Sequence, residues 1–393
     1  MTTVASSVSG TATQWNGQGH TWIAPSGEAI AFYFDGTNWV YRTSSAAPYS
    51  SWSSASTVTG SLLAGAFAGY MDAATGNLHV AYKRTGGPLP TYRLFTKGGA
   101  GAGWSMGGAV NVATSGDYGN DAAAPHITLD LSGRIWIMMT EWVGGYAGRV
   151  FYSADGSSWT NYFNGDERGL SASSAHVAPC FNGGTQYMLV MDQRSGNVRW
   201  RRAQTSGGSV GVISSAQTVG TFSTHDDHSS DMVGMPDGRV LLAVAPAGGG
   251  EFAIRTLVYT PSSDTWAYST GAQATSDIGS GTSDKWPALA VNPTTGTVYC
   301  VWSEFSSSNN YAVVYREFTP GTNTWGSKVT LQAAGADRIY DAAGCDGVSL
   351  LGTVTNATSS LVECFVATVG TPPAAGGAVF APPVLRYAHL LVR

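Results

Sequence analysis

Charged residues are scarce in this chain. Of its 393 residues, only 11% are Asp, Glu, Lys or Arg, whereas an ordinary soluble domain carries roughly 25%. Long exposed helices need runs of Glu, Lys, Ala and Leu, so this composition argues against a helical protein. The polar surface has to come from Ser, Thr, Asn and Gly, which suits short strands joined by tight turns.

Basic clusters and long apolar runs are also missing. The net charge is −5 and no basic run occurs, so the electrostatic footprint of a nucleic-acid-binding protein is absent. No segment approaches the roughly 18 consecutive apolar residues of a membrane span. The first ten residues, MTTVASSVSG, lack the basic and apolar regions of a secretory signal. We therefore expect no nucleic-acid partner, no membrane insertion and no signal peptide.

The few cysteines form no pattern. The four of them lie far apart and show no C-x-x-C spacing, the arrangement typical of zinc and redox sites. They are Cys180, Cys300, Cys345 and Cys364. We expect buried free thiols, and no cofactor or metal is predicted.

What the chain does contain is a sevenfold repeat, the first feature to establish in a chain of this composition. A glycine turn followed at once by an apolar strand recurs, as in PSGEAIAFYF and LSGRIWIMM. The glycines that mark the repeat are Gly27, Gly76, Gly133, Gly184, Gly238, Gly296 and Gly347. Successive glycines are 49 to 58 residues apart, about the length that four short strands and their turns require.

Two further markers keep phase with the glycines. A strand carrying arginine follows each of the first six turns, with Arg42, Arg93, Arg149, Arg199, Arg255 and Arg316. A tryptophan comes 9 to 11 residues after five of these arginines, at Trp52, Trp104, Trp159, Trp266 and Trp325. The fourth repeat alone has VGVISS in that place. Three markers in fixed order predict a repeating four-stranded unit.

The predicted fold is all-β, a single seven-bladed β-propeller of four-stranded antiparallel blades covering residues 1–393. The expected blades are residues 18–60, 61–115, 120–170, 172–222, 226–272, 280–333 and 336–393, with 1–15 completing the last. The N-terminal segment resembles the outer strands, such as SSASTVTG. We therefore expect the N-terminal strand to close the ring and leave no open edge.

One turn carries a resemblance to a known family. The segment SADGSSW, residues 153–159, resembles the Asp-box S-x-D-x-G-x-T-W of the bacterial neuraminidase repeat, with weaker matches at TPSSDTW and TPGTNTW. Resemblance to this sialidase-like propeller superfamily implies fold rather than activity, because its box is a structural hairpin between the third and fourth strands. Sialidases also carry an R-I-P motif, which this chain lacks. We expect the phased arginines to make a repeated structural contact, and we expect no sialidase activity.

A site is predicted where the inner strands begin, because equivalent positions of all blades converge at one mouth of a propeller's channel. Residues about seven before each glycine are His20, Tyr70, His126, His176, Asp231, Lys285 with Trp286, and Tyr340 with Asp341. Just before Asp231 the segment THDDHSSD adds Asp226, Asp227 and His228. These histidines either bond a neighbouring blade or form a sugar-binding funnel, in which Trp286 and Trp22 stack on a pyranose ring.

A lytic chemistry can be written for this site. The segment DDHSSDMVGMPDGR is similar to the D-D-H-N-x-P…D-G-R stretch of lyase-like repeat proteins, although its Asn and Pro are absent here. That resemblance implies a uronate lyase in which His228 or His176 is the base, Tyr340 the acid and Lys285 the carboxylate clamp. The ligand-binding set is His20, His126, Asp226, Asp227, Asp231, Trp286 and Asp341. For a glycoside hydrolase, Glu141 and Glu304 are the candidate carboxylates.

The leading hypothesis is a surface-displayed recognition or structural propeller that binds a glycan. Its style of composition is that of a bacteriophage virion protein used for adsorption or decoration. The predicted partner is a cell-surface or extracellular polysaccharide, with other virion subunits or copies of this chain as further candidates, and the predicted location is the virion or the cell exterior. The alternative is a polysaccharide lyase or glycoside hydrolase acting at the central funnel. A scaffold for protein contacts is the third hypothesis.

Overall fold

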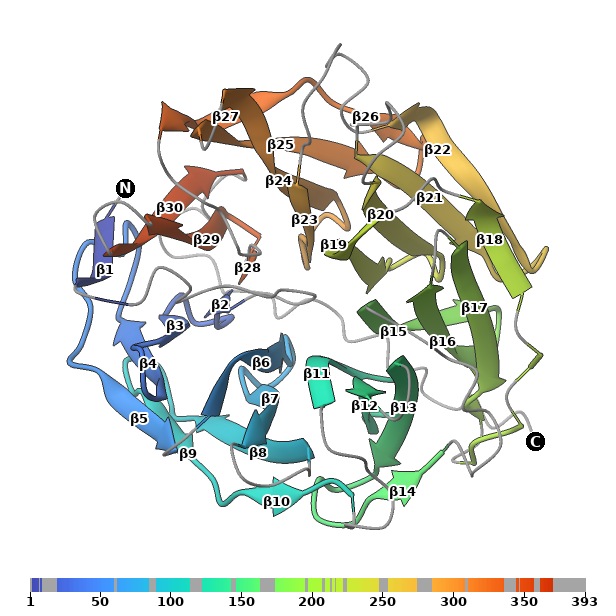
Figure 1. Cartoon of the computed structure of the whole chain (residues 1–393), viewed down its shortest axis with the longest axis horizontal. Coiled ribbons are helices and arrows are strands. Elements are labelled where there is room, and N and C mark those ends of the chain that lie inside the picture. Colours follow the sequence, from blue (N-terminus) through green and yellow to red (C-terminus); the bar gives the residue numbers. More distant parts are fainter. Residues whose placement is uncertain are drawn as a thin grey trace, which may run out of the picture.

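Seven antiparallel sheets surround a common axis (Figure 1), which confirms the predicted seven-bladed propeller. The computed structural model describes residues 2–6, 8, 20–59, 62–84, 90–113, 122–142, 146–162, 174–194, 197–206, 209–212, 214–215, 217–221, 225–246, 254–273, 285–307, 310–335, 344–345, 347–356 and 361–369. Across these ranges the chain is essentially all strand and turn, and none of it forms a helix of the length and apolarity that crossing a membrane requires.

The blades follow one another in chain order. From the axis outward, the strands of the first four blades are β2 (Thr21–Ile23), β3 (Ala29–Phe34), β4 (Trp39–Ser44) and β5 (Ser56–Thr59); β6 (Leu62–Met71), β7 (Leu78–Arg84), β8 (Pro90–Lys97) and β10 (Val110–Asn111), with β9 (Trp104–Met106) also on β8; β11 (Ala122–Leu129), β12 (Ile135–Trp142), β13 (Tyr146–Ser153) and β14 (Thr160–Asn161); and β15 (Ser174–Asn182), β16 (Thr185–Arg194), β17 (Asn197–Gln204) and β18 (Gln217–Thr221).

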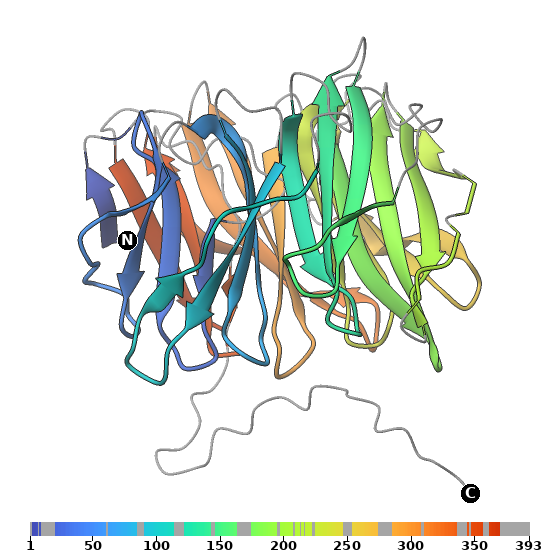
Figure 2. The same cartoon turned by 90° about the horizontal axis from the view of Figure 1, so that it is seen from below.

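The last three blades complete the ring. Their strands are β19 (His225–Gly234), β20 (Val240–Pro246), β21 (Arg255–Thr260) and β22 (Thr265–Gln273); β23 (Lys285–Val291), β24 (Val298–Ser307), β25 (Asn310–Thr319) and β26 (Thr324–Trp325), with β27 (Val329–Gly335) also on β25; and β28 (Gly344–Cys345), β29 (Ser349–Asn356), β30 (Leu361–Thr368) and β1 (Thr2–Ser6). Seen from the side, the strands run between the two faces of a disc (Figure 2).

The first strand of the chain closes the last blade, as predicted. β1 pairs antiparallel with β30, with Thr2 opposite Cys364 and Ser6 opposite Leu361. Val4 is buried and belongs to the core between blades 7 and 1. The N-terminal strand therefore completes the sheet of blade 7 as its outermost strand, and apolar packing joins blade 7 to blade 1.

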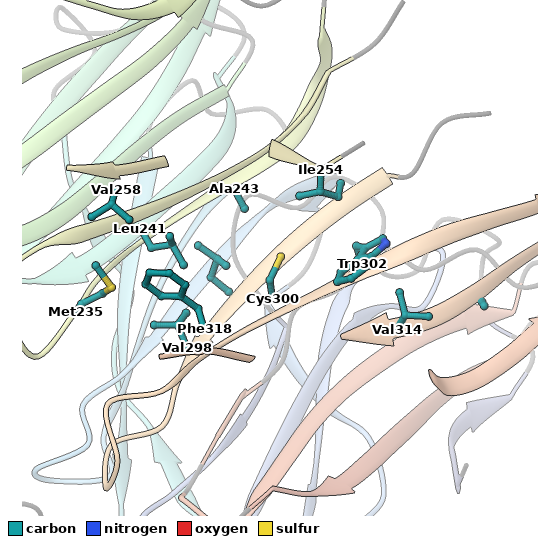
Figure 3. Packing of buried hydrophobic residues seen from close by; sticks show 12 residues of the cluster. Met235, Leu241, Ala243, Ile254, Val258, Val298, Cys300, Trp302, Val314 and Phe318 are labelled. Atoms are coloured by element: carbon teal, nitrogen blue, oxygen red, sulfur yellow. The ribbon is translucent and has the colours of Figure 1, made fainter. Parts of the chain in front are cut away.

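Each blade packs on both neighbours, so its middle strands are apolar on both faces. In β12 the consecutive residues from Ile135 to Met139 are all buried. Between blades 5 and 6, Met235 and Leu241 from one sheet meet Val298 and Phe318 from the next (Figure 3). The core of the molecule is thus a set of apolar layers between blades.

The glycines that mark the repeat adopt the left-handed backbone that disfavours other residues. φ is +90° at Gly27, +83° at Gly133 and +89° at Gly238. In blade 4 the residue with positive φ is Gly183, at +57°, not the predicted Gly184. The reason is a shorter hairpin there, in which Asn182 pairs directly with Thr185.

The phased tryptophans seal these layers. Trp104, Trp159, Trp266 and Trp325 pack against the cores between their own blade and the preceding one. In blade 4, which lacks the tryptophan, Val210 packs against the core shared with blade 3. The third marker is therefore a packing device, and a smaller apolar side chain can replace it.

The turn from Ser153 to Trp159 is held by side-chain hydrogen bonds. Asp155 Oδ1 accepts the N–H groups of Ser157 at 2.8 Å and Ser158 at 3.0 Å, and these bonds hold the pKa of Asp155 well below its usual range. Trp159 Nε1 donates to the Gly156 carbonyl at 3.3 Å. The turn lies between β13 and β14, the third and fourth strands of blade 3.

Two of the marker arginines contact a tyrosine of their own blade. Arg42 Nε donates to the Tyr33 hydroxyl at 3.0 Å, and Arg93 Nε donates to the Tyr82 hydroxyl at 2.7 Å. Both tyrosines lie on the second strand of the same blade. Arg316 differs, since its Nε donates to the Gly326 carbonyl at 2.7 Å. The contact with tyrosine is thus shared by blades 1 and 2, and a repeat of it in every blade stays a prediction.

Ion pairs tie neighbouring blades together. Lys97 of blade 2 lies 3.2 Å from the carboxylate of Glu28 in blade 1, and both side chains are buried. Arg202 of blade 4 lies 2.9 Å from Asp264 in blade 5, and this pair is more exposed. Polar contacts therefore cross the seams between blades alongside the apolar layers.

Candidate functional site

Four inner strands from consecutive blades lie side by side around the axis. They are β11, β15, β19 and β23 (Figure 1). Each inner strand starts at one face of the disc, here called the entry face, and ends at the glycine turn on the opposite face. These strands carry most of the predicted site residues.

Three of those residues form one compact group, here called the His–His–Asp cluster: His126 on β11, His176 on β15 and Asp231 on β19. One nitrogen or oxygen atom from each side chain lies within 4.8 Å of the others. His126 Nε2 is 3.8 Å from Asp231 Oδ1, and the two imidazole rings meet edge to face with centroids 4.8 Å apart. All three side chains are buried, with exposures of 2%, 0% and 6% respectively.

Backbone and hydroxyl groups orient the histidines. His176 Nε2 is 2.9 Å from the Ser230 hydroxyl. The Val177 N–H, on the neighbouring strand, donates to His126 Nδ1 at 3.3 Å. Each ring therefore contacts the inner strand of the next blade, as the structural interpretation of these histidines predicted.

The carboxylate of Asp231 is held in the same way. Its Oδ1 accepts the Met232 N–H at 2.7 Å, and its Oδ2 accepts the Leu289 N–H of β23 at 2.7 Å. The cluster and its hydrogen bonds thus connect blades 3, 4, 5 and 6.

Burial sets the protonation of the cluster, because it penalises the charged form of each group. It lowers the pKa of His126 to about 3 and that of His176 to about 3. It raises the pKa of Asp231 to about 7, against the smaller opposing effects of His176 and the Leu289 and Met232 N–H groups. At neutral pH both imidazoles are uncharged, and the carboxyl group titrates in the physiological range.

His20 lies outside this cluster. Its buried ring contacts Trp39 and Phe67, with centroid distances of 5.0 Å and 5.7 Å, and burial lowers its pKa to about 3. Trp22 is also a core residue, buried against Phe32. The expectation that Trp22 stacks on a sugar is therefore wrong, because its ring fills the layer between blades 1 and 2.

Other predicted residues are placed only by their backbone. Asp226, Asp227 and His228 lie on β19 ahead of Asp231, and Lys285 with Trp286 opens β23. Their side chains fall outside the described part of the structure, as do Tyr340 and Asp341 altogether. The predicted roles of these residues as base, acid, clamp and ligand contacts stay predictions.

Sequence reasoning missed Ser230 and the Leu289 amide as partners of the cluster. Ser230 had a signal, since it sits beside Asp231 in the polar segment THDDHSSD. The backbone N–H of Leu289 had none. Of the two glycosidase candidates, Glu304 forms an ion pair with Lys328 at 2.6 Å, and the side chain of Glu141 is not described.

Comparison with known proteins places the fold. No protein-family model matches this sequence, and no curated protein matches it. The solved structures similar to it include a PL25 ulvan lyase bound to GlcA(1-4)Rha3S, with a TM-score of 0.56 and 10% identity over 92% of this chain and 96% of that one. A mutant of AofleA from Arthrobotrys oligospora gives 0.50 and 11% identity over 82% and 89%.

A third similar structure is the Penicillium chrysogenum alpha-L-arabinanase complexed with arabinobiose, with a TM-score of 0.47 and 10% identity over 93% of this chain and 97% of that one. At such low identities the comparisons establish architecture. The chain is a seven-bladed β-propeller, and its structural neighbours include a polysaccharide lyase.

Proposed function

We propose that this protein binds a polysaccharide at the entry face of the ring. The observation that carries the proposal is that equivalent positions of the inner strands hold polar, titratable side chains in some blades and alanine in others. His126 and Asp231 each lie opposite the residue five positions after their turn glycine, and blades 2 and 6 have Ala68 and Ala288 at that place. Alanine satisfies the fold there, so the histidine and carboxylate are not required by the propeller itself.

Groups with perturbed pKa values that gather at one place are candidates for a functional site. Among the described residues, three such groups gather in blades 3, 4 and 5. The backbones of His228 and Lys285 lie on β19 and β23, between this cluster and the entry face. We therefore propose His228 and Lys285 as contacts for a ligand on that part of the face.

An acidic polysaccharide is the substrate class we favour. Lys285 offers a cation for a uronate carboxylate, and Trp286 beside it offers an aromatic face for a sugar ring. The likeness to the ulvan lyase covers 92% of this chain, and that lyase is bound to a uronate-containing ligand. It supports the proposal as a shared scaffold on which such ligands bind.

Lytic cleavage is the second candidate function. The DDH segment around His228 favours it, with His228 as base, Tyr340 as acid and Lys285 neutralising the carboxylate. His176 is fully buried and bonded to Ser230, which suits positioning of the strand entry better than contact with a polymer.

We further propose that the protein is displayed on a virion or another extracellular surface, alone or with further subunits. The charge-poor, Gly-rich composition supports this. The likeness to the sialidase-like superfamily belongs to the same proposal. It is supported by the hydrogen-bonded turn at residues 153–159, and it implies common architecture without sialidase activity.

The test is a binding and cleavage screen of the purified chain against acidic and neutral polysaccharides. We expect retention on a uronate polymer, lost in Lys285→Met and kept in the control Lys328→Met, which removes an equal charge on the outer part of blade 6. New absorbance from unsaturated uronates would establish the lyase function. Absence of binding and cleavage with both polymer classes would overturn the proposal and leave protein partners as the function of this face.

A further inference from the structure

The His–His–Asp cluster has the donor set of a transition-metal site. Two imidazoles and one carboxylate are ligands that zinc and related divalent ions accept together. Donor atoms bound to one tetrahedral zinc ion are roughly 3.3 to 3.6 Å apart, given bond lengths of about 2.0 to 2.2 Å. The 3.8 Å between His126 Nε2 and Asp231 Oδ1 is close to that value, and the third donor lies within 4.8 Å.

The charge of the cluster is unbalanced. Asp231 is buried, and its ion partner within the described part of the chain is an imidazole, that of His126, at 3.8 Å. A buried carboxylate without a cation is costly. A divalent ion between these three side chains would supply the positive charge.

The hydrogen bonds of His176 fit a ligand. Its Nε2 contacts the Ser230 hydroxyl, whereas its buried Nδ1 has no hydrogen-bond partner among the described residues. Imidazoles that bind a metal commonly hold their second nitrogen in a hydrogen bond of this kind, which fixes the ring. The nitrogen left over on His176 is therefore available for coordination.

We propose that His126, His176 and Asp231 hold one divalent transition-metal ion that links blades 3, 4 and 5. The two imidazoles select an ion of the zinc class over calcium or magnesium. Coordination by His126 Nε2 places the ring proton on Nδ1 and ends its contact with the Val177 N–H. That contact is weak at 3.3 Å. Three protein ligands leave a fourth position for a further donor.

The experiment measures metal binding directly. Chelator-treated protein is dialysed against Zn²⁺ or Co²⁺, and the bound ion is counted by elemental analysis and titration calorimetry. We expect one ion per chain, a higher melting temperature and no comparable effect of Ca²⁺ or Mg²⁺. Asp231→Asn and His176→Gln should weaken the binding about 100-fold or more. His79→Gln, in blade 2 and bonded to Tyr92, should leave it unchanged.

Three results would contradict the proposed metal site. No saturable binding by the wild-type chain, or undiminished binding by both cluster variants, would overturn the proposal. Should the variants fail to fold, X-ray absorption of the Co²⁺-loaded wild-type protein decides. Two imidazole nitrogens and a carboxylate oxygen are expected around the metal, and a sulfur ligand such as Cys300 would refute the assignment. Metal binding is independent of the proposed glycan, so either can fail alone.

Discussion

Gly156 occupies a crowded point in the turn between β13 and β14. Its φ is +76°, and a Cβ built there would lie 2.7 Å from Tyr92 Cε1 of blade 2. We expect Gly156→Ala to lower the free energy of unfolding by about 2–3 kcal/mol, since it adds steric overlap to left-handed strain. Gly133→Ala, at φ +83° with nothing within 4 Å, should cost only the strain, about 1 kcal/mol. Urea unfolding measures both free energies. Equal losses in the two variants would show that the Tyr92 side chain moves aside at no cost.

Burial of His20 makes the free energy of unfolding depend on pH. Burial lowers its pKa from 6.5 to about 3, so between these values the unfolded chain binds a proton that the folded chain does not. Stability is fully present above pH 6.5 and falls as the pH drops toward 3, by at most about 1.4 kcal/mol per pH unit for this group. In His20→Gln the free energy of unfolding should fall less steeply with decreasing pH. Denaturant titrations at several pH values measure both slopes, and identical slopes would contradict this account.

At the scale of elements, we expect the short strand β1 to contribute strongly to the stability of the ring. Val4 is 1% exposed and packs in the core with Tyr33 and Val362. Val4→Asp buries an unpaired charge, so we expect it to cost about 3 kcal/mol or more and to release the edge of β30 for association. Ser6→Asp, at an exposed position on the same strand, is the matched control. Thermal unfolding and light scattering report the two effects, and similar melting for both variants would argue against closure by β1.

The repeat markers predicted the elements well because each has one local cause. A glycine is needed where φ is positive, and a tryptophan fills the layer between blades, so both recur once per blade. Blade 4 departs from the marker pattern at both places, with its tighter hairpin at Gly183 and with Val210 packed against the core in place of a tryptophan. Trp22 was misassigned for another reason, since an aromatic near a strand start looks the same whether it faces solvent or the next sheet.

The candidate site was predicted only in part. The phase of the repeat put His126, His176 and Asp231 on inner strands, where they are found. The ladder of β11 is irregular between Ala123 and His126, and that of β19 between His225 and Ser230. Such a bulge changes which face each following side chain takes. Sequence spacing could therefore not show that these three side chains turn inward and meet in a buried cluster.

At the scale of the whole molecule, the propeller is a closed ring in which each blade packs against its two neighbours. Strands in close contact belong to the same blade or to adjacent blades, so the ring resembles a repeat protein in which each unit senses its neighbours. Unlike an open array, it has no terminal unit, because blade 1 packs against blade 7. Substitutions in distant blades should therefore have additive effects on the free energy of unfolding, and the ring should still unfold in a single transition.

This leads to a test of additivity between distant seams. Lys97→Met leaves Glu28 buried without its ion partner and should cost about 3 kcal/mol or more. Arg202→Met removes a more exposed pair with Asp264 and should cost about 1 kcal/mol. The first seam joins blades 1 and 2 and the second joins blades 4 and 5, so the double variant should lose the sum within about 0.5 kcal/mol.

The matched control is a pair in contact. Arg202→Met and Asp264→Asn remove two ends of one ion pair, so their effects should not add, because the second change has no interaction left to break. Denaturant unfolding of all variants gives the free energies, and a single transition in each is expected. Equal non-additivity for the distant pair and the contacting pair would show that the contacts between blades are coupled around the whole ring. The metal proposed for blades 3 to 5 would then stabilise the contacts between all blades and not only those it bridges.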